Sequence, residues 1–153
     1  SIQWLEDFLK NFAGTGLVGC NVTVPHKESV MPYLNNITNT AKRIGAVNTI
    51  TLSKDGKLTG DNTDAYGFIT NLKHGCHNLT FSKKHVVLLG SGGAARAIIC
   101  GLVDEGVASI TITNRTYDKA QDLVKAFSNL SPNTNIIAAN WEDRRAILET
   151  CAL

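Results

Sequence analysis

Residues 84–116 of the chain are KHVVLLGSGGAARAIICGLVDEGVASITITNRT, and this stretch decides the fold. An apolar segment typical of a buried strand, His85–Leu89, leads into a glycine-rich turn and then into a helical pattern. A second β-branched segment, Ser109–Thr113, follows the helix. Strand, glycine turn, helix and strand in this order predict the first half of a dinucleotide-binding fold.

The glycine turn fits the pattern G-x-G-x-x-A, with small residues at Gly90, Gly92 and Ala95. The first permits a tight turn, the second lets a phosphate approach the backbone, and the third lets helix and strand pack closely. A pyrophosphate would then lie against the positive N-terminus of the helix. The residues predicted to form this loop are Gly90, Ser91, Gly92, Gly93 and Ala94.

The end of the second strand indicates which dinucleotide is bound. An NAD site usually has an acidic residue about 20 positions past the glycines, where it binds the ribose 2′-OH. Here that place is taken by Asn114, followed by Arg115, whose planar donors would attract a 2′-phosphate. Lys119 could add a second positive charge. The ordinary interpretation of both cations is a solvated helix start, but the acidic residue of an NAD site is missing as well. We therefore predict NADP, bound at this end by Asn114, Arg115, Thr116 and Lys119.

Composition places the chain among ordinary globular proteins, because 43% of its 153 residues are hydrophobic and 18% are charged. A net charge of +2 is too small to favour nucleic acid or a membrane surface as a partner. The four cysteines share no metal-like spacing, so we predict no metal site, and free thiols fit a reducing cytoplasm. We expect a cytoplasmic monomer or homodimer without nucleic-acid or membrane partners.

Apolar spacing and turn residues predict the remaining elements. Before residue 84 they are a helix over Ile2–Phe12, a buried strand over Leu17–Val24, a short helix opened by Pro25, strands over Ala46–Leu52 and Lys57–Asn62 joined by a hairpin turn, and a helix from the N-cap Asp64 to about Leu72. After the glycine-loop unit they are a helix over 116–128, a strand over Asn135–Ala139 and a helix over Trp141–Leu148.

Three polar clusters stand out before residue 74: GCNVTVPHK (19–27), GAVNT (45–49) and GDNTD (60–64). Taken singly, each has an ordinary interpretation as a surface lysine, a turn asparagine or a helix cap. Together they supply an amine, two carboxylates, an amide and a hydroxyl next to a dinucleotide fold. A polyhydroxy substrate requires such a set.

These clusters, with GSGGAAR and NRT after them, resemble the shikimate dehydrogenase family in order and spacing, from about Leu17 to Lys125. The resemblance implies an oxidoreductase that reversibly reduces 3-dehydroshikimate to shikimate with NADPH, a step of chorismate and aromatic amino-acid biosynthesis. Lys27 then matches the catalytic lysine of the family and Asp64 its partner. Thr23 and Asn48 match residues that, with this pair, bind the substrate's hydroxyl groups.

Some features of that family have no counterpart in this sequence. They are an N-terminal serine motif for the substrate carboxylate, the second half of the cofactor domain, and C-terminal helices with a substrate-contacting glutamine. We therefore expect a fragment, truncated at both ends. Its predicted fold class is α/β: a partial substrate-binding α/β domain at residues 1–73, a linker at 74–83, and the first half of a Rossmann-type doubly wound NADP-binding domain at 84–153.

Several alternatives stay open at this point. One is a quinate/shikimate dehydrogenase that uses NAD, against which Arg115 argues. Another is a catalytically inactive nucleotide-binding fragment. The cofactor domain of a different NADP enzyme, such as a glutamyl-tRNA reductase or a methylene-tetrahydrofolate dehydrogenase, is disfavoured by the GCNVTVPHK and GDNTD clusters. For the reaction itself, Lys27 either donates the proton to the reduced oxygen or binds and polarises that oxygen while water carries the proton.

Overall fold

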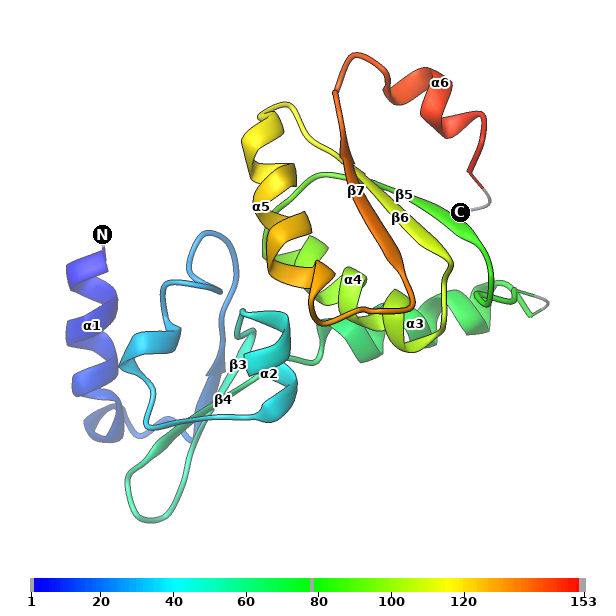
Figure 1. Ribbon diagram of the computed structural model, residues 1–153. Helices are drawn as coiled ribbons and strands as arrows, with labels where there is room; N and C mark the ends of the chain where they lie inside the picture. The colour runs from blue at the N-terminus through cyan, green and yellow to red at the C-terminus, as the bar shows by residue number, and fades with distance from the viewer. Residues whose placement is uncertain (1, 78, 152–153) are drawn as a thin grey trace. The chain divides into compact units, whose positions relative to one another are not determined.

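The computed structural model describes residues 2–77 and 79–151. The chain divides into two compact units, the first ending at Asp64 and the second beginning at Ala65 (Figure 1). Within the described residues, no helix has the length and apolar character needed to cross a membrane.

The first unit combines a small mixed sheet with short helices. Its strands are ordered β1-β3-β4-β2; β3 is antiparallel to both β1 and β4, and β2 is parallel to β4. In chain order the elements are α1 (Ile2–Lys10), the 3₁₀ helix η1 (Phe12–Thr15), β1 (Gly19–Asn21), the 3₁₀ helix η2 (Met31–Tyr33), β2 (Asn36–Ile37), α2 (Asn39–Ile44), β3 (Thr49–Leu52) and β4 (Leu58–Asp61).

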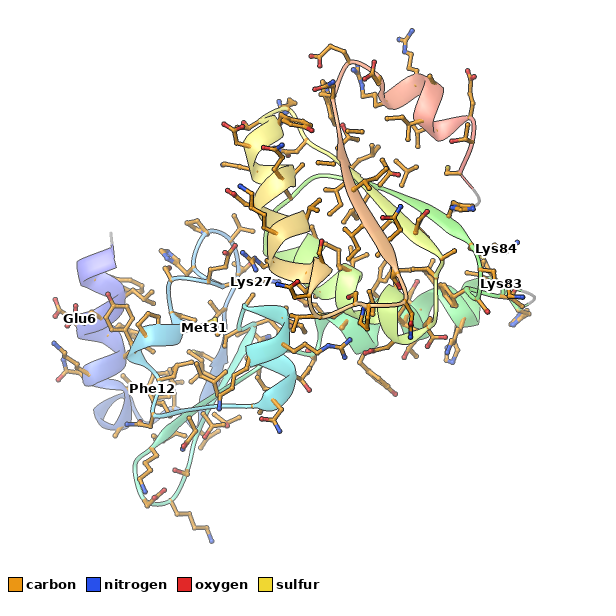
Figure 2. All side chains as sticks on the ribbon, in the orientation of Figure 1. Glu6, Phe12, Lys27, Met31, Lys83 and Lys84 are labelled. Atoms are coloured by element: carbon orange, nitrogen blue, oxygen red, sulfur yellow. The ribbon has the colours of Figure 1, made fainter. Side chains whose placement is uncertain are left out.

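The core of this unit forms because α1 is amphipathic. Its side chains Leu5 and Leu9 are buried, as is Phe12 in the 3₁₀ turn that follows, and they join one cluster with Val30 and Ile50. Met31 packs against the same cluster (Figure 2). The helix predicted over Ile2–Phe12 is therefore confirmed as far as Lys10, and Phe12 begins the 3₁₀ helix that follows.

Two predictions for the segment after α1 are wrong. Only Gly19–Asn21 forms a strand, and Val18 and Val24, expected in a buried strand, are 83% and 74% exposed. The residues after Pro25 form turns in place of a helix: the His26 N–H donates to the carbonyl of Thr23 at 2.8 Å. An apolar run shows that a segment favours burial, but the rest of the unit decides whether it is covered.

The hairpin between β3 and β4 is confirmed, with Ile50 opposite Gly60 in the register. The helix α2 was not predicted, although its start carries a recognisable cap. Thr38 precedes the helix, and its hydroxyl accepts the N–H of Ala41 at 3.2 Å. The same hydroxyl donates to Asp61 Oδ1 at 2.6 Å, so the cap also ties α2 to the end of β4.

The second unit is a parallel sheet with helices between its strands. The strands are ordered β5-β6-β7, and His85 lies opposite Ser109, which in turn lies opposite Asn135. Its elements are α3, which begins at Asp64 (Asp64–Gly75), β5 (His85–Leu89), α4 (Gly93–Asp104), β6 (Ser109–Thr113), α5 (Tyr117–Ser128), β7 (Asn135–Ala139) and α6 (Arg144–Leu148). This alternation confirms the α/β class and the Rossmann-type order of the three strands.

The parallel sheet is held by apolar side chains on the middle strand and the helices. Ile110 and Ile112 of β6 are fully buried, as are Ile99 and Leu102 of α4. The helix α4 also packs closely on α3, since a Cβ at Gly101 would come within 2.8 Å of the Ile69 side chain. The start of α4 lies next to the end of β5 because only residues 90–92, the glycine turn, separate the two elements.

Candidate active site

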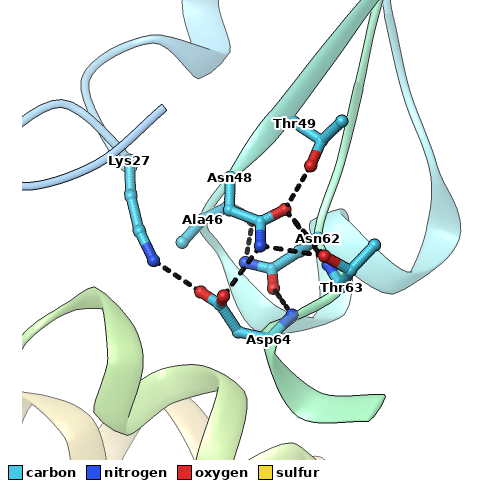
Figure 3. A network of polar contacts seen from close by, with 7 residues as sticks. All are labelled: Lys27, Ala46, Asn48, Thr49, Asn62, Thr63 and Asp64. Carbon is cyan, nitrogen blue, oxygen red and sulfur yellow. Dashed lines mark hydrogen bonds and ion pairs between the residues drawn. The ribbon is translucent and has the colours of Figure 1, made fainter. Parts of the chain in front are cut away.

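A polar cluster in the first unit is centred on the carboxylate of Asp64 (Figure 3). Lys27 Nζ lies 2.5 Å from Asp64 Oδ2, and Asn48 Nδ2 donates to Asp64 Oδ1 at 2.7 Å. The Lys27 side chain is 15% exposed and that of Asp64 is 30% exposed. Both oxygens of a half-buried carboxylate are thus bonded by side chains from two other chain segments, and such charge-assisted bonds are strong.

The backbone before β3 positions two members of this cluster. Val47 donates its N–H to the carbonyl of Lys27 at 2.7 Å. This bond fixes the turn at residues 24–30, which carries Lys27 and is called the lysine turn below. The N–H of Asn48 donates to the carbonyl of Asp61 at 2.9 Å, and its carbonyl accepts the N–H of Val22 at 2.7 Å. Residues 46–48 are therefore the junction at which the lysine turn meets the end of β4.

The amide of Asn48 is held in one orientation by two threonines. Its Oδ1 accepts the Thr49 hydroxyl at 2.8 Å and the N–H of Thr63 at 3.1 Å. Its Nδ2 donates to the Thr63 hydroxyl at 3.1 Å in addition to Asp64. The amide nitrogen consequently faces the carboxylate, and its donor remains directed at Asp64.

Asn62 belongs to the same network, although the sequence analysis assigned no role to this residue. It is 3% exposed, its Nδ2 donates to the carbonyl of Ala46 at 2.9 Å, and its Oδ1 accepts the N–H of Asp64 at 2.9 Å. An asparagine that accepts the N–H two residues further on is a common turn device, and the GDNTD motif contained that signal. The sequence predicts Asp64 as the N-cap of this helix, whereas in the structure Asp64 is the first residue of α3.

The structure brings Lys27, Asn48 and Asp64 together, but within the described residues Thr23 is not bonded to any of the three. Thr23 is exposed and follows β1, and its carbonyl accepts the N–H of His26. Among the described residues, no hydrogen bond joins its hydroxyl to the other three.

The predicted phosphate loop lies at the end of β5. Gly90 has a φ of 117°, a conformation that favours glycine, and its N–H donates to the carbonyl of Thr113 at 2.9 Å. A Cβ added at Gly90 or Gly92 would meet no described atom within 4 Å. Gly92 precedes α4 without a side-chain cap, so the backbone donors of the first turn remain available to an anion.

The other predicted loop residues surround this helix start. Ser91 and Gly93 are half-buried, Ala94 is exposed, and Ala95 is buried where α4 meets the rest of the unit. Open space beside two glycines, together with a free helix N-terminus, fits the pyrophosphate of a dinucleotide.

The residues predicted for the adenosine end follow β6 directly. Asn114 is half-buried, and its Nδ2 donates to the carbonyl of Thr116 at 2.8 Å. Arg115, Thr116 and Lys119 are exposed, and neither cation forms an ion pair within the described residues. Two uncommitted cations beside an amide suit a phosphate better than a bare ribose hydroxyl.

No three His, Cys, Asp or Glu side chains gather as a metal site in the part of the chain that the structure describes.

Two family descriptions match this chain. The shikimate dehydrogenase substrate binding domain matches residues 2–50, and the shikimate / quinate 5-dehydrogenase family matches residues 73–149. The second match alone spans 77 of the 153 residues, or half of the chain.

Named proteins agree with these descriptions. Shikimate dehydrogenase (NADP(+)) of Magnetococcus marinus is 44% identical over 145 residues, which are 95% of this chain and 50% of that protein. Quinate dehydrogenase from Corynebacterium glutamicum in complex with NAD has a TM-score of 0.85 at 28% identity, over 96% of this chain and 51% of that one. A shikimate dehydrogenase in complex with NADP⁺ has a TM-score of 0.78 at 35% identity, over 89% and 47%.

The chain spans about half the length of the curated relatives it matches. The first match nevertheless includes Lys27 and Asn48 of the first unit, and the second includes the glycine loop of the second unit. The chain therefore belongs to the shikimate dehydrogenase family.

Proposed function

We propose that this chain is part of an NADP-dependent shikimate dehydrogenase that reversibly reduces 3-dehydroshikimate to shikimate, in the route to chorismate and the aromatic amino acids. The observation that carries the proposal is the Lys27–Asp64–Asn48 cluster, in which an ammonium and an amide lie 2.5 and 2.7 Å from the two oxygens of one carboxylate. The names of the relatives support the same reaction.

The proposed domain organisation follows the two parts of the chemistry. Residues 1–73 belong to the domain that binds the substrate, residues 84–153 belong to the domain that binds NADP, and residues 74–83 link them. The two family descriptions, which match 2–50 and 73–149, support this division.

On the substrate side, Lys27, Asn48, Asp64 and Thr23 bind the hydroxyl groups. The ammonium and the amide donate hydrogen bonds to oxygen, and the carboxylate accepts them from hydroxyls. The charged pair is the part of this set that can also act on a reacting oxygen.

NADPH supplies the hydride when it is bound. The ketone oxygen gains negative charge as the ketone is reduced, and Lys27 is the residue that stabilises it. Lys27 either passes a proton from Nζ to that oxygen, or binds and polarises the oxygen while water supplies the proton. In both cases Asp64 holds Nζ in place through the 2.5 Å contact.

On the cofactor side, residues 90–94 hold the pyrophosphate through the N-terminus of α4. Asn114, Arg115, Thr116 and Lys119 bind the adenosine end, and the two cations select a 2′-phosphate. The wider setting we propose is a cytoplasmic monomer or homodimer without nucleic-acid or membrane partners. The four free cysteines support a reducing compartment.

Calorimetric titration of the chain with NADP⁺, NAD⁺, shikimate and quinate, followed by a turnover assay on the same sample, tests the proposal. We expect NADP⁺ to bind more tightly than NAD⁺, and shikimate more tightly than quinate. Preference for NAD⁺ and quinate would favour the quinate dehydrogenase alternative. Cofactor binding with neither shikimate binding nor turnover would favour an inactive nucleotide-binding fragment.

A further inference from the structure

Asn62 is the one amide among the buried polar side chains of the described residues, which are Asn62, Thr113, Ser131 and Thr134. Its amide bonds at both ends, donating to the Ala46 carbonyl and accepting the N–H of Asp64, each at 2.9 Å. A buried amide is costly unless it is bonded, so these two contacts hold the side chain in one orientation.

The two bonds join the segments that carry the candidate active site. Asp64 is the first residue of α3, and Ala46 lies two positions before Asn48. The next residue, Val47, bonds the backbone of Lys27 at 2.7 Å. Residues 46–48 therefore anchor the lysine turn through Val47, the start of α3 through Asn62, and the amide of Asn48 directly.

We infer that Asn62 is a positioning residue, which sets where the Asp64 carboxylate stands relative to Lys27 and Asn48. With 3% of its surface exposed, it acts through these neighbours and not by contact with a ligand. Position matters because a displacement of about 1 Å can cost roughly 10²-fold in rate. The effect on turnover rests on the proposed function, whereas the effect on the Lys27–Asp64 pair does not.

Asn35 provides a control for a side chain–backbone bond that lies outside the cluster. Its Oδ1 accepts the N–H of Leu58 at 2.8 Å, so it too joins two segments of the first unit through one amide. It forms no hydrogen bond with Lys27, Asn48 or Asp64 among the described residues. Asn35 is exposed and makes one such bond where Asn62 makes two, so Asn35→Ala controls for the loss of a single side chain–backbone bond and leaves the cluster intact.

The experiment compares Asn62→Ala, Asn62→Ser and Asn35→Ala in the full chain. Serine keeps an oxygen for the N–H two residues on but is too short to reach Ala46. The first readout is the ¹⁵N resonance of the Lys27 ammonium, whose hydrogen exchange is slowed by its pairing with Asp64. We expect Asn62→Ala to weaken this signal, Asn62→Ser to restore part of it, and Asn35→Ala to leave it unchanged.

The second readout is turnover of 3-dehydroshikimate. We expect Asn62→Ala to lower kcat by about 10-fold or more with unchanged NADP⁺ affinity. A Lys27 signal and kcat that are the same in Asn62→Ala and Asn35→Ala would overturn the inference. So would unfolding of both Asn62 variants while Asn35→Ala stays folded, because the amide would then serve the fold alone. Absence of both shikimate binding and turnover in the unmodified chain would count against the proposed function, and the Lys27 signal would still decide the role of Asn62.

Discussion

Lys27 and Asp64 are opposite charges held 2.5 Å apart in a half-buried setting, and their proposed role is tested residue by residue. In the whole enzyme of which we propose this chain to be a part, Lys27→Ala should lower kcat by roughly 10²–10⁴ with little change in NADP⁺ affinity, because the ammonium acts on the reacting oxygen. Asp64→Asn keeps the shape but removes the charge that holds Lys27, so it should lower kcat less. The loss of activation free energy in the double variant should be smaller than the sum of the two single losses, since the residues act as a unit.

Steady-state assays of 3-dehydroshikimate reduction with the three variants check this prediction. Lys57→Ala is the control, because it breaks an ion pair between two exposed side chains outside the cluster. The side chains of Lys57 and Asp55 are each 58% exposed, so their pairing contributes little. Turnover like that of the unmodified chain in Lys27→Ala, or additive losses in the double variant, would contradict the proposed pair.

Arg115 is exposed and forms no ion pair within the described residues, so its charge is available to a ligand. Arg115→Ala should weaken binding of NADP⁺ by about 1.5–3 kcal/mol and that of NAD⁺ much less, because only NADP⁺ carries the 2′-phosphate. Titration calorimetry with both cofactors measures the difference. Lys125→Ala, which removes an exposed cation on α5, should alter neither affinity, and equal losses for both cofactors in Arg115→Ala would rule out the assignment.

At the level of elements, two buried threonines of the second unit differ in their hydrogen bonding. Thr113 is the last residue of β6, and Thr134 directly precedes β7. The Thr113 hydroxyl, at the end of β6, has no hydrogen-bond partner among the described residues, whereas that of Thr134 donates to the Val107 carbonyl at 2.9 Å. Thr134→Val should lower the free energy of unfolding by about 1–3 kcal/mol, because a buried carbonyl loses its donor. Thr113→Val should leave it unchanged or raise it. Urea denaturation of both variants measures the two free energies of unfolding. Similar losses in Thr134→Val and Thr113→Val would contradict the difference in hydrogen bonding between the two hydroxyls.

The contact between α3 and α4 depends on the lack of a side chain at Gly101. A Cβ there would lie 2.8 Å from Ile69 Cγ1 and 3.4 Å from the Ala65 carbonyl oxygen. Gly101→Ala should therefore destabilise the fold by about 1–3 kcal/mol through overpacking. Adding Ile69→Val removes part of the obstructing side chain, so the double variant should melt at a higher temperature than Gly101→Ala alone. A Gly101→Ala variant as stable as the unmodified chain would show that the helices separate without cost.

At the scale of the whole molecule, each ligand should stabilise its own unit. Ligand at 100 times its dissociation constant contributes about 2.7 kcal/mol to the state that binds it. NADP⁺ should slow amide hydrogen exchange mainly in β5, α4 and β6, and shikimate mainly around β3, β4 and the lysine turn. Hydrogen-exchange mass spectrometry with each ligand alone checks this. Protection by shikimate confined to the second unit would contradict the proposed substrate site.

Local sequence pattern was sufficient for the parallel sheet. The strands His85–Leu89, Ser109–Thr113 and Asn135–Ala139 are observed with the bounds that the sequence predicts. Parallel strands lie between helices, so they appear as short β-branched runs bounded by turn residues. The run Leu17–Val24 has similar composition but forms only three residues of strand and is largely exposed, because composition does not record what covers a segment.

The sequence by itself determined the residue types of the candidate site and the glycine turn, since a positive φ at Gly90 and a helix start at Gly93 are local properties. Only the tertiary structure decided that Lys27 meets Asp64, which is 37 residues away, and that Asn62 and Thr63 hold the cluster together. That meeting depends on the register of β3 against β4 and on the bonds of residues 46–48 to two other segments. Contacts between segments so far apart in the sequence depend on how the whole unit packs, which no local period of the sequence specifies.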